Sequence, residues 1–200
     1  MSQSPWRRQL VDGGHAAVQR RYSDLVAAAS NVYGYTHGVI PGLLQTRAYA
    51  HAVLTEMAAF HLRPGDDVDA AVEARLARQA HLDDNGKHFR LIVDEAVLHR
   101  VVYAVSVHAE QLQHLLSLVS LPRGDTLVGV LPLATLTFTP QNGFDVFDGD
   151  VYVETYAGEA VHKRTEDEAV VYARAFERLW ADAVTGAPAE DLIAAAATRL

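Results

Sequence analysis

Apolar residues recur at helical spacing in several stretches of the chain, and this periodicity predicts amphipathic helices. One stretch places Val68, Val72 and Leu76 four residues apart. Another opens with the pair Thr165 and Glu168, a capping box in which the hydroxyl and the carboxylate satisfy exposed N–H groups reciprocally. The predicted helices cover residues 13–30, 41–60, 67–81, 107–119, 165–186 and 188–200, with one or two helical turns over 94–101.

Shorter runs rich in β-branched and aromatic residues lie between turn signals and predict strands. Four of these runs fall between Leu127 and Tyr156, where Pro132, residues 140–143 and residues 148–150 interrupt the apolar pattern. Closely spaced short strands of this kind are typical of a largely antiparallel meander. The predicted strands cover residues 31–40, 89–93, 127–131, 136–139, 144–147 and 151–155.

The apolar segment Ile40–Thr46 contains a Pro-Gly breaker between a predicted strand and a predicted helix. Proline is tolerated at the first position of a helix, because its missing N–H would have no helical partner there. We therefore expect the strand to end near Ile40 and an uninterrupted helix to run from Pro41 to about Phe60.

The order of these elements predicts an α+β fold: a single domain with a small, largely antiparallel sheet packed against several helices. A chain of 200 residues suits one domain. Within it we expect residues 1–30 to form an N-terminal helix and residues 31–200 to form the α+β body.

The charge balance argues against a nucleic-acid partner. The 17 Lys and Arg residues against 25 Asp and Glu residues give a formal net charge of −8, whereas phosphate binding needs a basic surface. The chain contains no cysteine, which excludes disulfides and thiolate-ligated metals. It shows neither an apolar leader nor a stretch that could span a bilayer, so we expect a cytoplasmic protein without membrane contact.

The sequence offers no metal or cofactor motif. Among the ten histidines no two are three or four residues apart, the spacing that would place two ligands on one helix face, so we predict no metal site. Glycine-rich nucleotide loops and a nucleophile elbow are also missing, so we predict no cofactor. Asp145, Asp148 and Asp150 lie close together, and a hairpin turn explains them better than a calcium loop.

Two carboxylate pairs and one aromatic cluster remain as candidate sites. Asp94/Glu95 and Glu154/Glu159 adjoin short apolar strands, where burial would raise their pKa values and suit them to acid–base work. Asp94 could equally cap a helix, because it lies where a strand passes into one. The aromatic cluster combines rings with hydrogen-bonding groups, as a small-molecule site requires, although a core edge would look the same. Its members are Tyr33, Tyr35, His37, Gln45 and Tyr49.

A series of motifs follows the chain in a recognisable order. They are Val39–Leu54, Val72–Gln79, Leu91–Leu98, Gln111–Leu116, Val128–Pro132, Gly143-Phe144, Val151–Thr155 with Glu159, and Tyr172–Leu179. Together they resemble the C-terminal domain of unknown function of actinobacterial XRE-type helix-turn-helix regulators, which are often described as antitoxin-like. The resemblance covers about Pro5 to the end of the chain.

The resemblance implies an effector domain that senses a ligand or partner. In the family a helix-turn-helix precedes this domain, whereas here only Met1–Ser4 precede Trp6, Arg7 and Arg8, which look like the remnant of the inter-domain linker. We expect either an excised effector domain or a stand-alone one, without direct DNA contact. It would bind a small-molecule ligand or a protein partner. Alternatively, the ligand pocket would serve a cofactor-independent cyclase, isomerase or lyase in specialised-metabolite biosynthesis.

The resemblance transfers no catalytic residues, so the site candidates come from chemistry and position alone. For an enzyme they are His37, Tyr49, Glu95, His99 and Glu154, and for ligand binding they are Tyr35, His37, Gln45, Tyr49, Glu154 and Tyr156. Apolar positions on the final helix, at Leu192, Ile193 and Leu200, would need a cover and predict a homodimer.

Overall fold

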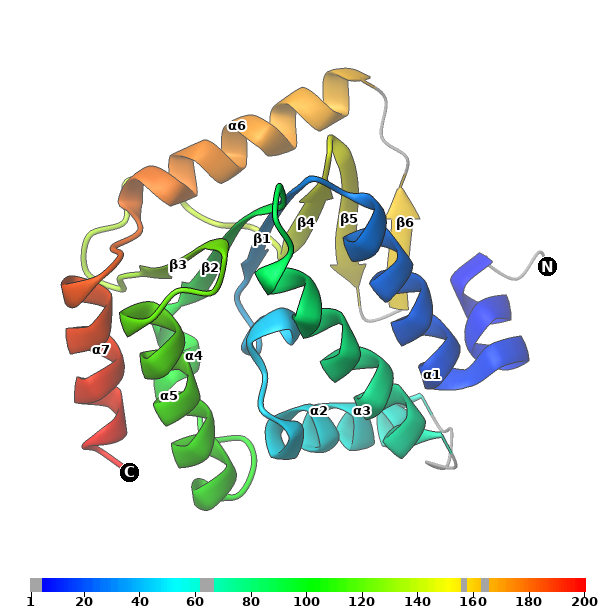
Figure 1. Ribbon diagram of the computed structural model, residues 1–200, viewed down its shortest axis with the longest axis horizontal. Helices are drawn as coiled ribbons and strands as arrows, with labels where there is room; N and C mark the ends of the chain where they lie inside the picture. The colour runs from blue at the N-terminus through cyan, green and yellow to red at the C-terminus, as the bar shows by residue number, and fades with distance from the viewer. Residues whose placement is uncertain (1–4, 62–66, 156–157, 163–165) are drawn as a thin grey trace.

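The computed structural model describes residues 5–61, 67–155, 158–162 and 166–200. It contains the following elements in chain order (Figure 1): α1 Pro5–Ala28, β1 Asn31–Thr36, the 3-10 turn η1 Gly42–Leu44, α2 Arg47–Phe60, α3 Val68–Ala77, the 3-10 turn η2 Arg78–Asp83, β2 His88–Asp94, α4 Glu95–His99, α5 Val105–Ser120, β3 Asp125–Leu131, β4 Phe144–Phe147, β5 Asp150–Thr155, β6 Gly158–His162, α6 Glu166–Asp182 and α7 Ala187–Ala197. The predicted α+β class with a single domain is confirmed.

The six strands form one mixed sheet in the order β3-β2-β1-β4-β5-β6. Strands β1, β2 and β3 run parallel to one another, whereas β4, β5 and β6 pair antiparallel from β1 outward. The predicted antiparallel meander is therefore correct for β4 and β5 but wrong for residues 127–131, because β3 pairs with β2 in parallel. A strand joins a parallel neighbour only through a long crossover, which the local sequence pattern around it does not reveal.

Two further strand predictions are wrong. Residues 136–139 are not a strand but part of the loop that connects β3 with β4, and Thr137 in that loop bonds to Asp182 of α6 rather than to a neighbouring strand. Residues 158–162, for which no strand is predicted, form the edge strand β6. The prediction of a capping box at Thr165 and Glu168 falls outside the described residues, because Thr165 is not among them.

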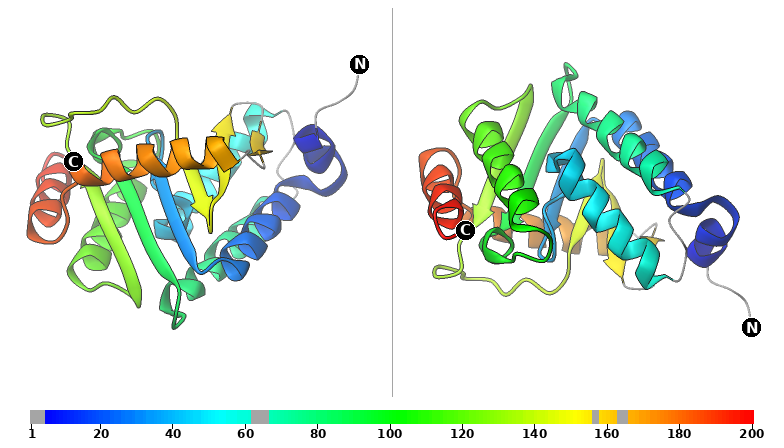
Figure 2. Two further views of the ribbon diagram at one scale, coloured as in Figure 1. Left: turned by 90° about the horizontal axis from the view of Figure 1, so that it is seen from above. Right: turned by 90° about the horizontal axis from the view of Figure 1, so that it is seen from below.

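The sheet separates two unequal hydrophobic layers (Figure 2). Helix α6 lies alone over one face, whereas the other helices lie on the opposite side. Side chains of β1 to β5 that the structure describes alternate between the two layers, as the two-residue period of a strand requires. In β2, for example, Leu91 and Val93 belong to the larger cluster, and Ile92 belongs to the cluster under α6.

The segment Ile40–Thr46 departs from the predicted continuous helix. Pro41 precedes the short turn η1, Gln45 then returns to an extended conformation (φ −83°, ψ 141°), and α2 begins only at Arg47. Thr46 caps α2, since its hydroxyl accepts a hydrogen bond from the backbone N–H of Tyr49 at 3.3 Å. Tertiary partners impose this interruption, because the carbonyl of Gln45 accepts a hydrogen bond from the side chain of Gln79 (2.8 Å).

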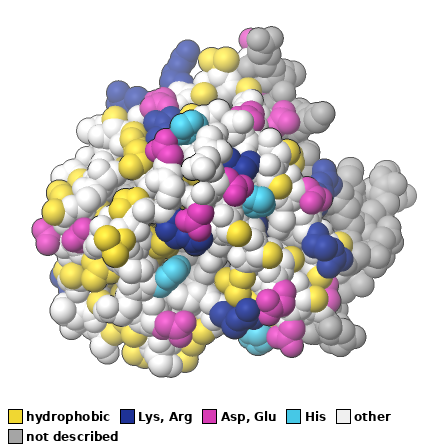
Figure 3. All heavy atoms as spheres, in the orientation of Figure 1, with side chains coloured by type: hydrophobic (Ala, Val, Ile, Leu, Met, Phe, Trp, Pro, Cys, Tyr) yellow, Lys and Arg dark blue, Asp and Glu magenta, His cyan; other side chains and the backbone are white. Residues whose placement is uncertain are grey.

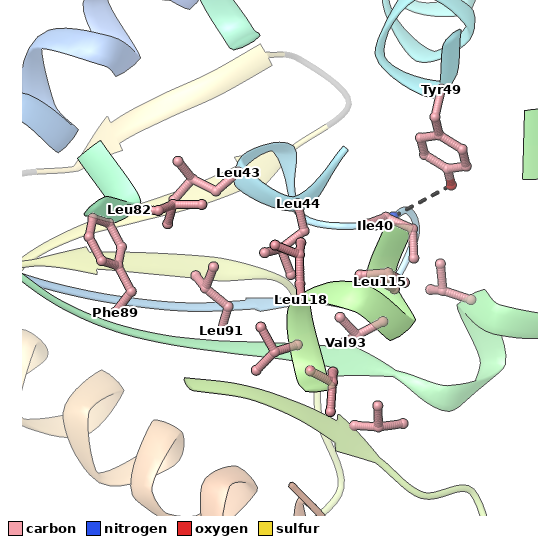
Figure 4. Close-up of a cluster of buried hydrophobic side chains, with 14 of the residues drawn as sticks. Ile40, Leu43, Leu44, Tyr49, Leu82, Phe89, Leu91, Val93, Leu115 and Leu118 are labelled. Carbon is pink, nitrogen blue, oxygen red and sulfur yellow. Dashed lines mark hydrogen bonds between the residues drawn. The ribbon is translucent and has the colours of Figure 1, made fainter. Parts of the chain in front are cut away.

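The apolar residues of the same segment lie deep in the larger cluster (Figure 4). Ile40 and Leu44 are fully buried and Leu43 nearly so. They pack beside side chains from the sheet and from α5 and η2, which are Leu82, Phe89, Leu91, Val93, Leu115 and Leu118. The segment between β1 and α2 is therefore part of the core rather than a surface connection.

A two-residue turn joins β4 to β5, as predicted for Asp148-Gly149-Asp150. Asp148 (φ 48°) and Gly149 (φ 101°) both have positive φ, as the type I′ hairpin turn requires. The carboxylate of Asp148 accepts hydrogen bonds from the backbone N–H groups of Ser30 and Asn31, both at 2.8 Å. The aspartates thus form a turn that also anchors the start of β1.

The prediction that the final helix needs an intermolecular cover is wrong for its central residue. Ile193 is 1% exposed, and Leu192 is partly buried against the same cluster. These two residues are covered within the chain, since α7 packs mainly against α5, whereas Leu200 is 41% exposed and the predicted homodimer stays a prediction.

Candidate functional site

The carboxyl ends of the parallel strands bring five of the predicted site residues to one edge of the sheet. The strand register pairs Thr36 with Val93 and Asp94 with Leu131, so His37, Asp94 and Leu131 follow one another across the strand ends. We define the strand-end site as Tyr35, His37, Asp94, Glu95 and His99. Open sheets with parallel strands bind their ligands at the carboxyl ends of the strands. The site lies where the strand order reverses, so that later strands are added on the other side of the first one. Here that reversal falls between β1 and β4.

Tyr35 and Asp94 form the buried floor of the strand-end site. Tyr35 is 1% exposed, and its hydroxyl donates a hydrogen bond to Asp94 Oδ2 at 3.1 Å. Burial raises the pKa of the Tyr35 phenol well above its ordinary value of 10.0, and the neighbouring Asp94 carboxylate raises the pKa further. The phenol therefore stays protonated and acts as a hydrogen-bond donor rather than as a base.

Asp94 also ends β2 and begins α4. Its Oδ1 accepts a hydrogen bond from the backbone N–H of Ala96 at 2.9 Å, so the expected helix cap is present. Both carboxylate oxygens of Asp94 thus have partners, one in the helix and one in Tyr35. Asp94 fixes the positions of Tyr35 and α4. The side chains with exposed surface belong to His37, Glu95 and His99.

His37 is the exposed aromatic group of the strand-end site. Its ring stacks on that of Tyr35, with centroids 6.2 Å apart and planes inclined by 24°. The guanidinium of Arg100 donates hydrogen bonds to the carbonyls of His37 (3.2 Å) and Gly38 (3.1 Å). The backbone that carries the imidazole is therefore fixed from both sides, and the ring itself faces solvent.

Glu95 and His99 lie one helical turn apart on α4. Glu95 Oε1 is 3.6 Å from His99 Nε2, and the other oxygen, Oε2, accepts a hydrogen bond from the backbone N–H of Leu133 at 2.7 Å. The two side chains are only 16% and 28% exposed. A half-buried carboxylate beside an imidazole can accept or pass a proton, and it can equally bind a polar group of a ligand.

The loop of residues 132–143 crosses the carboxyl ends of β3, β2 and β1 before it enters β4 (Figure 2). Glu95 fixes its first part through Leu133, and Asp182 of α6 fixes its middle by accepting hydrogen bonds from the backbone N–H and the hydroxyl of Thr137, at 2.7 and 2.8 Å. Both hydrogen bonds hold the pKa of Asp182 below its ordinary value. The loop thus has anchors on α4 and α6, on either side of the strand ends.

Gln45 and Tyr49, which sequence reasoning groups with Tyr35 and His37, lie in the core instead. Gln45 is 1% exposed, and its side chain donates to the carbonyl of Ile40 (2.7 Å) and accepts from Arg75 (2.7 Å). The Tyr49 hydroxyl accepts a hydrogen bond from the N–H of Ile40 at 3.5 Å, and burial raises the pKa of its phenol. Both residues support the segment Ile40–Thr46 and lie away from the strand ends, so they are separate from Tyr35, which is equally buried but contacts the exposed His37 ring.

Sequence reasoning missed Arg100 and the loop that starts at Pro132. Arg100 is an ordinary surface cation in the sequence, and Leu133 contributes only a backbone N–H. The parallel register of β1, β2 and β3 is the signal that would have placed the two segments together. The side chain of Glu154 and the whole of Tyr156, both predicted site residues, lie outside the described residues.

Within the described ranges, no three histidine, aspartate or glutamate side chains come together as metal ligands. None of the helices in these ranges combines the length and apolar character that crossing a bilayer demands.

Residues 19–195 match the family described as Domain of unknown function (DUF5753). A search of curated proteins and a search of solved structures each returned no match. The family match includes every residue of the strand-end site and the segment Ile40–Thr46. Because it spans far more than half of the 200 residues, the chain belongs to the DUF5753 family.

Proposed function

We propose that this chain is the effector domain of a regulator and that it binds a small-molecule ligand at the strand-end site, without contacting DNA. The observation that carries the proposal is the exposed His37 imidazole, which stacks on the buried Tyr35 phenol at the carboxyl edge of the parallel strands. An aromatic surface beside a few fixed polar groups is typical of small-molecule sites. The net charge of −8 supports the exclusion of DNA as a partner.

The carboxylates favour binding over catalysis. Asp94 has both oxygens engaged by Tyr35 and Ala96, and Glu95 has one oxygen engaged by the backbone of Leu133. Asp94 therefore has no oxygen left without a partner in the fold, and Glu95 offers a ligand only Oε1. The site therefore suits a sensor that binds its ligand against the exposed His37 ring.

The resemblance to XRE-type regulators of actinobacteria supports the same proposal in finer terms. In such a protein a helix-turn-helix would be attached before α1, and ligand binding in the effector domain would bias its affinity for DNA in the cytoplasm. The loop of residues 132–143 would respond to the ligand first, because it spans the strand ends and contacts both α4 and α6.

One observation favours a second function, that of a cofactor-independent cyclase, isomerase or lyase in specialised metabolism. Glu95 Oε1 and His99 Nε2, 3.6 Å apart, form the one carboxylate–imidazole pair within the strand-end site, and a ligand with an acidic C–H or O–H could exchange a proton with it. The two functions predict different results for the variant Glu95→Gln: an enzyme would lose turnover of the bound ligand, whereas a sensor has no turnover to lose.

A thermal-shift screen against metabolites tests the proposal, because a ligand that binds only the folded state raises its melting temperature. For each metabolite that stabilises the protein, we expect His37→Ala to weaken binding about tenfold or more in calorimetry, since it removes the exposed stacking surface. The matched control is His88→Ala, an exposed histidine at the amino end of β2 that pairs with Asp125. Its variant should bind as the wild type does.

Equal loss of binding in the His37→Ala and His88→Ala variants would contradict the location of the site. Conversion of the ligand to a product by the wild type, with turnover lost and binding retained in Glu95→Gln, would replace the sensor by the enzyme. Binding of a duplex DNA probe to the isolated chain at physiological salt would contradict the exclusion of DNA.

A further inference from the structure

Helix α6 exposes two large apolar side chains on the surface that faces away from the sheet. Val170 is 53% exposed and Val171 is 60% exposed, whereas Phe176 and Leu179 on the opposite side of the helix are buried against the sheet. In Figure 1 the helix forms the outermost layer on its side of the sheet, and no other helix or strand among the described residues lies over it. The apolar surface of α6 is therefore available to another molecule.

Two charged residues flank the valines at helical spacing. Asp167 lies three and four residues before Val170 and Val171, and Arg174 lies four and three residues after them, so all four share one face of α6. All four side chains are exposed. Neither Asp167 nor Arg174 has an ion-pair partner among the residues that the structure describes. Along the upper edge of Figure 3, where α6 lies, apolar side chains appear between basic and acidic ones.

The face formed by Asp167, Val170, Val171 and Arg174 is complementary to itself. Read from the amino end it is acidic, apolar and then basic, and read in reverse it is basic, apolar and then acidic. Two such faces placed antiparallel about a two-fold axis bring valines against valines and each Asp167 against the Arg174 of the other copy. A two-fold interface requires this kind of self-complementary surface.

We propose that α6 docks antiparallel on the α6 helix of a second copy of this chain, with the two-fold axis between Val170 and Val171. The occupant is another copy rather than an unrelated helix, because the charge order of the face fits its own reverse. The same arrangement in parallel would place Asp167 against Asp167 and Arg174 against Arg174, so the charges also set the direction of pairing. This interface is separate from the strand-end site and does not depend on the proposed function.

Leu121 is more exposed, at 77%, than either valine, and it provides a matched control. It lies just after α5 rather than on the outer face of α6. A change there tests whether any exposed apolar side chain promotes association or whether the pattern on α6 is required.

Sedimentation equilibrium of the full 200-residue chain, over concentrations up to about 1 mM, measures the association. We expect a monomer–dimer equilibrium in the wild type and a monomer in Val170→Glu. Asp167→Arg alone and Arg174→Asp alone should each raise the dimer Kd between about 5- and 30-fold, because each places two like-charge pairs in the interface. The double variant Asp167→Arg with Arg174→Asp restores both pairs in reverse and should recover dimerisation. Leu121→Glu should leave the Kd unchanged.

A wild type that stays monomeric over the whole range would overturn the proposal. A double charge swap no better than the two single variants would overturn it as well, since partner charges would then not be facing each other. So would a loss of dimerisation in Leu121→Glu equal to that in Val170→Glu. Far-ultraviolet circular dichroism of every variant establishes that the change concerns association and not folding, and the swap variant retains the composition of the wild type.

Discussion

Gln111 should contribute more to stability than any exposed residue of α5, because it satisfies two backbone groups of the segment Ile40–Thr46. Its side chain is fully buried. Oε1 accepts a hydrogen bond from the N–H of Thr46, and Nε2 donates one to the carbonyl of Leu44, both at 2.7 Å. One glutamine thus fixes the backbone on both sides of the extended residue Gln45.

The substitution Gln111→Leu removes both hydrogen bonds while it keeps most of the side-chain volume. Each of the two buried backbone groups left without a partner costs about 1–3 kcal/mol, and the added apolar burial returns about 1 kcal/mol, so we expect a loss of roughly 1–5 kcal/mol in the free energy of unfolding. Leucine and glutamine have similar helix propensities, so the helix itself adds little to the difference. For a chain of this length the melting temperature should fall by roughly 2–20 °C.

Urea denaturation followed by circular dichroism measures the effect, and the midpoint should fall while the slope of the transition stays constant. The matched control is Gln113→Leu on the same helix, where the side chain is exposed and the loss should stay within about 0.5 kcal/mol. A loss in Gln111→Leu no larger than in Gln113→Leu would refute the reasoning, because the two hydrogen bonds would then have no net value.

Two further perturbations test other parts of the fold. Tyr35→Phe should flatten the loss of stability between about pH 8 and pH 11, because the raised pKa of Tyr35 gives stability that is complete below the ordinary value of 10.0 and is lost as the pH rises toward the folded value. Free energies of unfolding from urea titrations would fall by up to about 1.4 kcal/mol more per pH unit in the wild type than in the variant, and parallel curves would contradict the assignment. Gly149→Ala should cost about 1–2 kcal/mol because of its φ of 101°, whereas Gly38→Ala, where an added Cβ would meet no atom within 4 Å, should be nearly neutral in the same denaturation experiment.

Local sequence patterns predicted most elements of this fold but not their pairing. The helices follow from apolar spacing, and the hairpin of β4 and β5 follows from Asp148-Gly149, because those signals act over a few residues. The parallel pairing of β3 with β2 depends on the crossover through α4 and α5, so the sequence of neither strand reveals it.

The candidate site was predicted in part, for the same reason. Tyr35, His37, Glu95 and His99 have chemistry that is visible in the sequence, and the strand register brings them to one edge. Gln45 and Tyr49 have the same chemistry but belong to the core, and only the tertiary contacts of Ile40 distinguish them. Residue type indicates what a side chain can do, whereas burial decides whether a ligand can reach it.

The mixed sheet also bears on the order in which the chain folds. Phe147 pairs with Asp150 across a two-residue turn, and such a hairpin closes within microseconds. Asn31 must instead find His88 after the whole intervening chain with α2 and α3 has been brought into place, and it must find its other neighbour, β4, across an even longer stretch. We therefore expect the antiparallel hairpin of β4 and β5 to form early. The pairing of β1, the strand that joins both halves of the sheet, should then limit the rate at which the native sheet is completed.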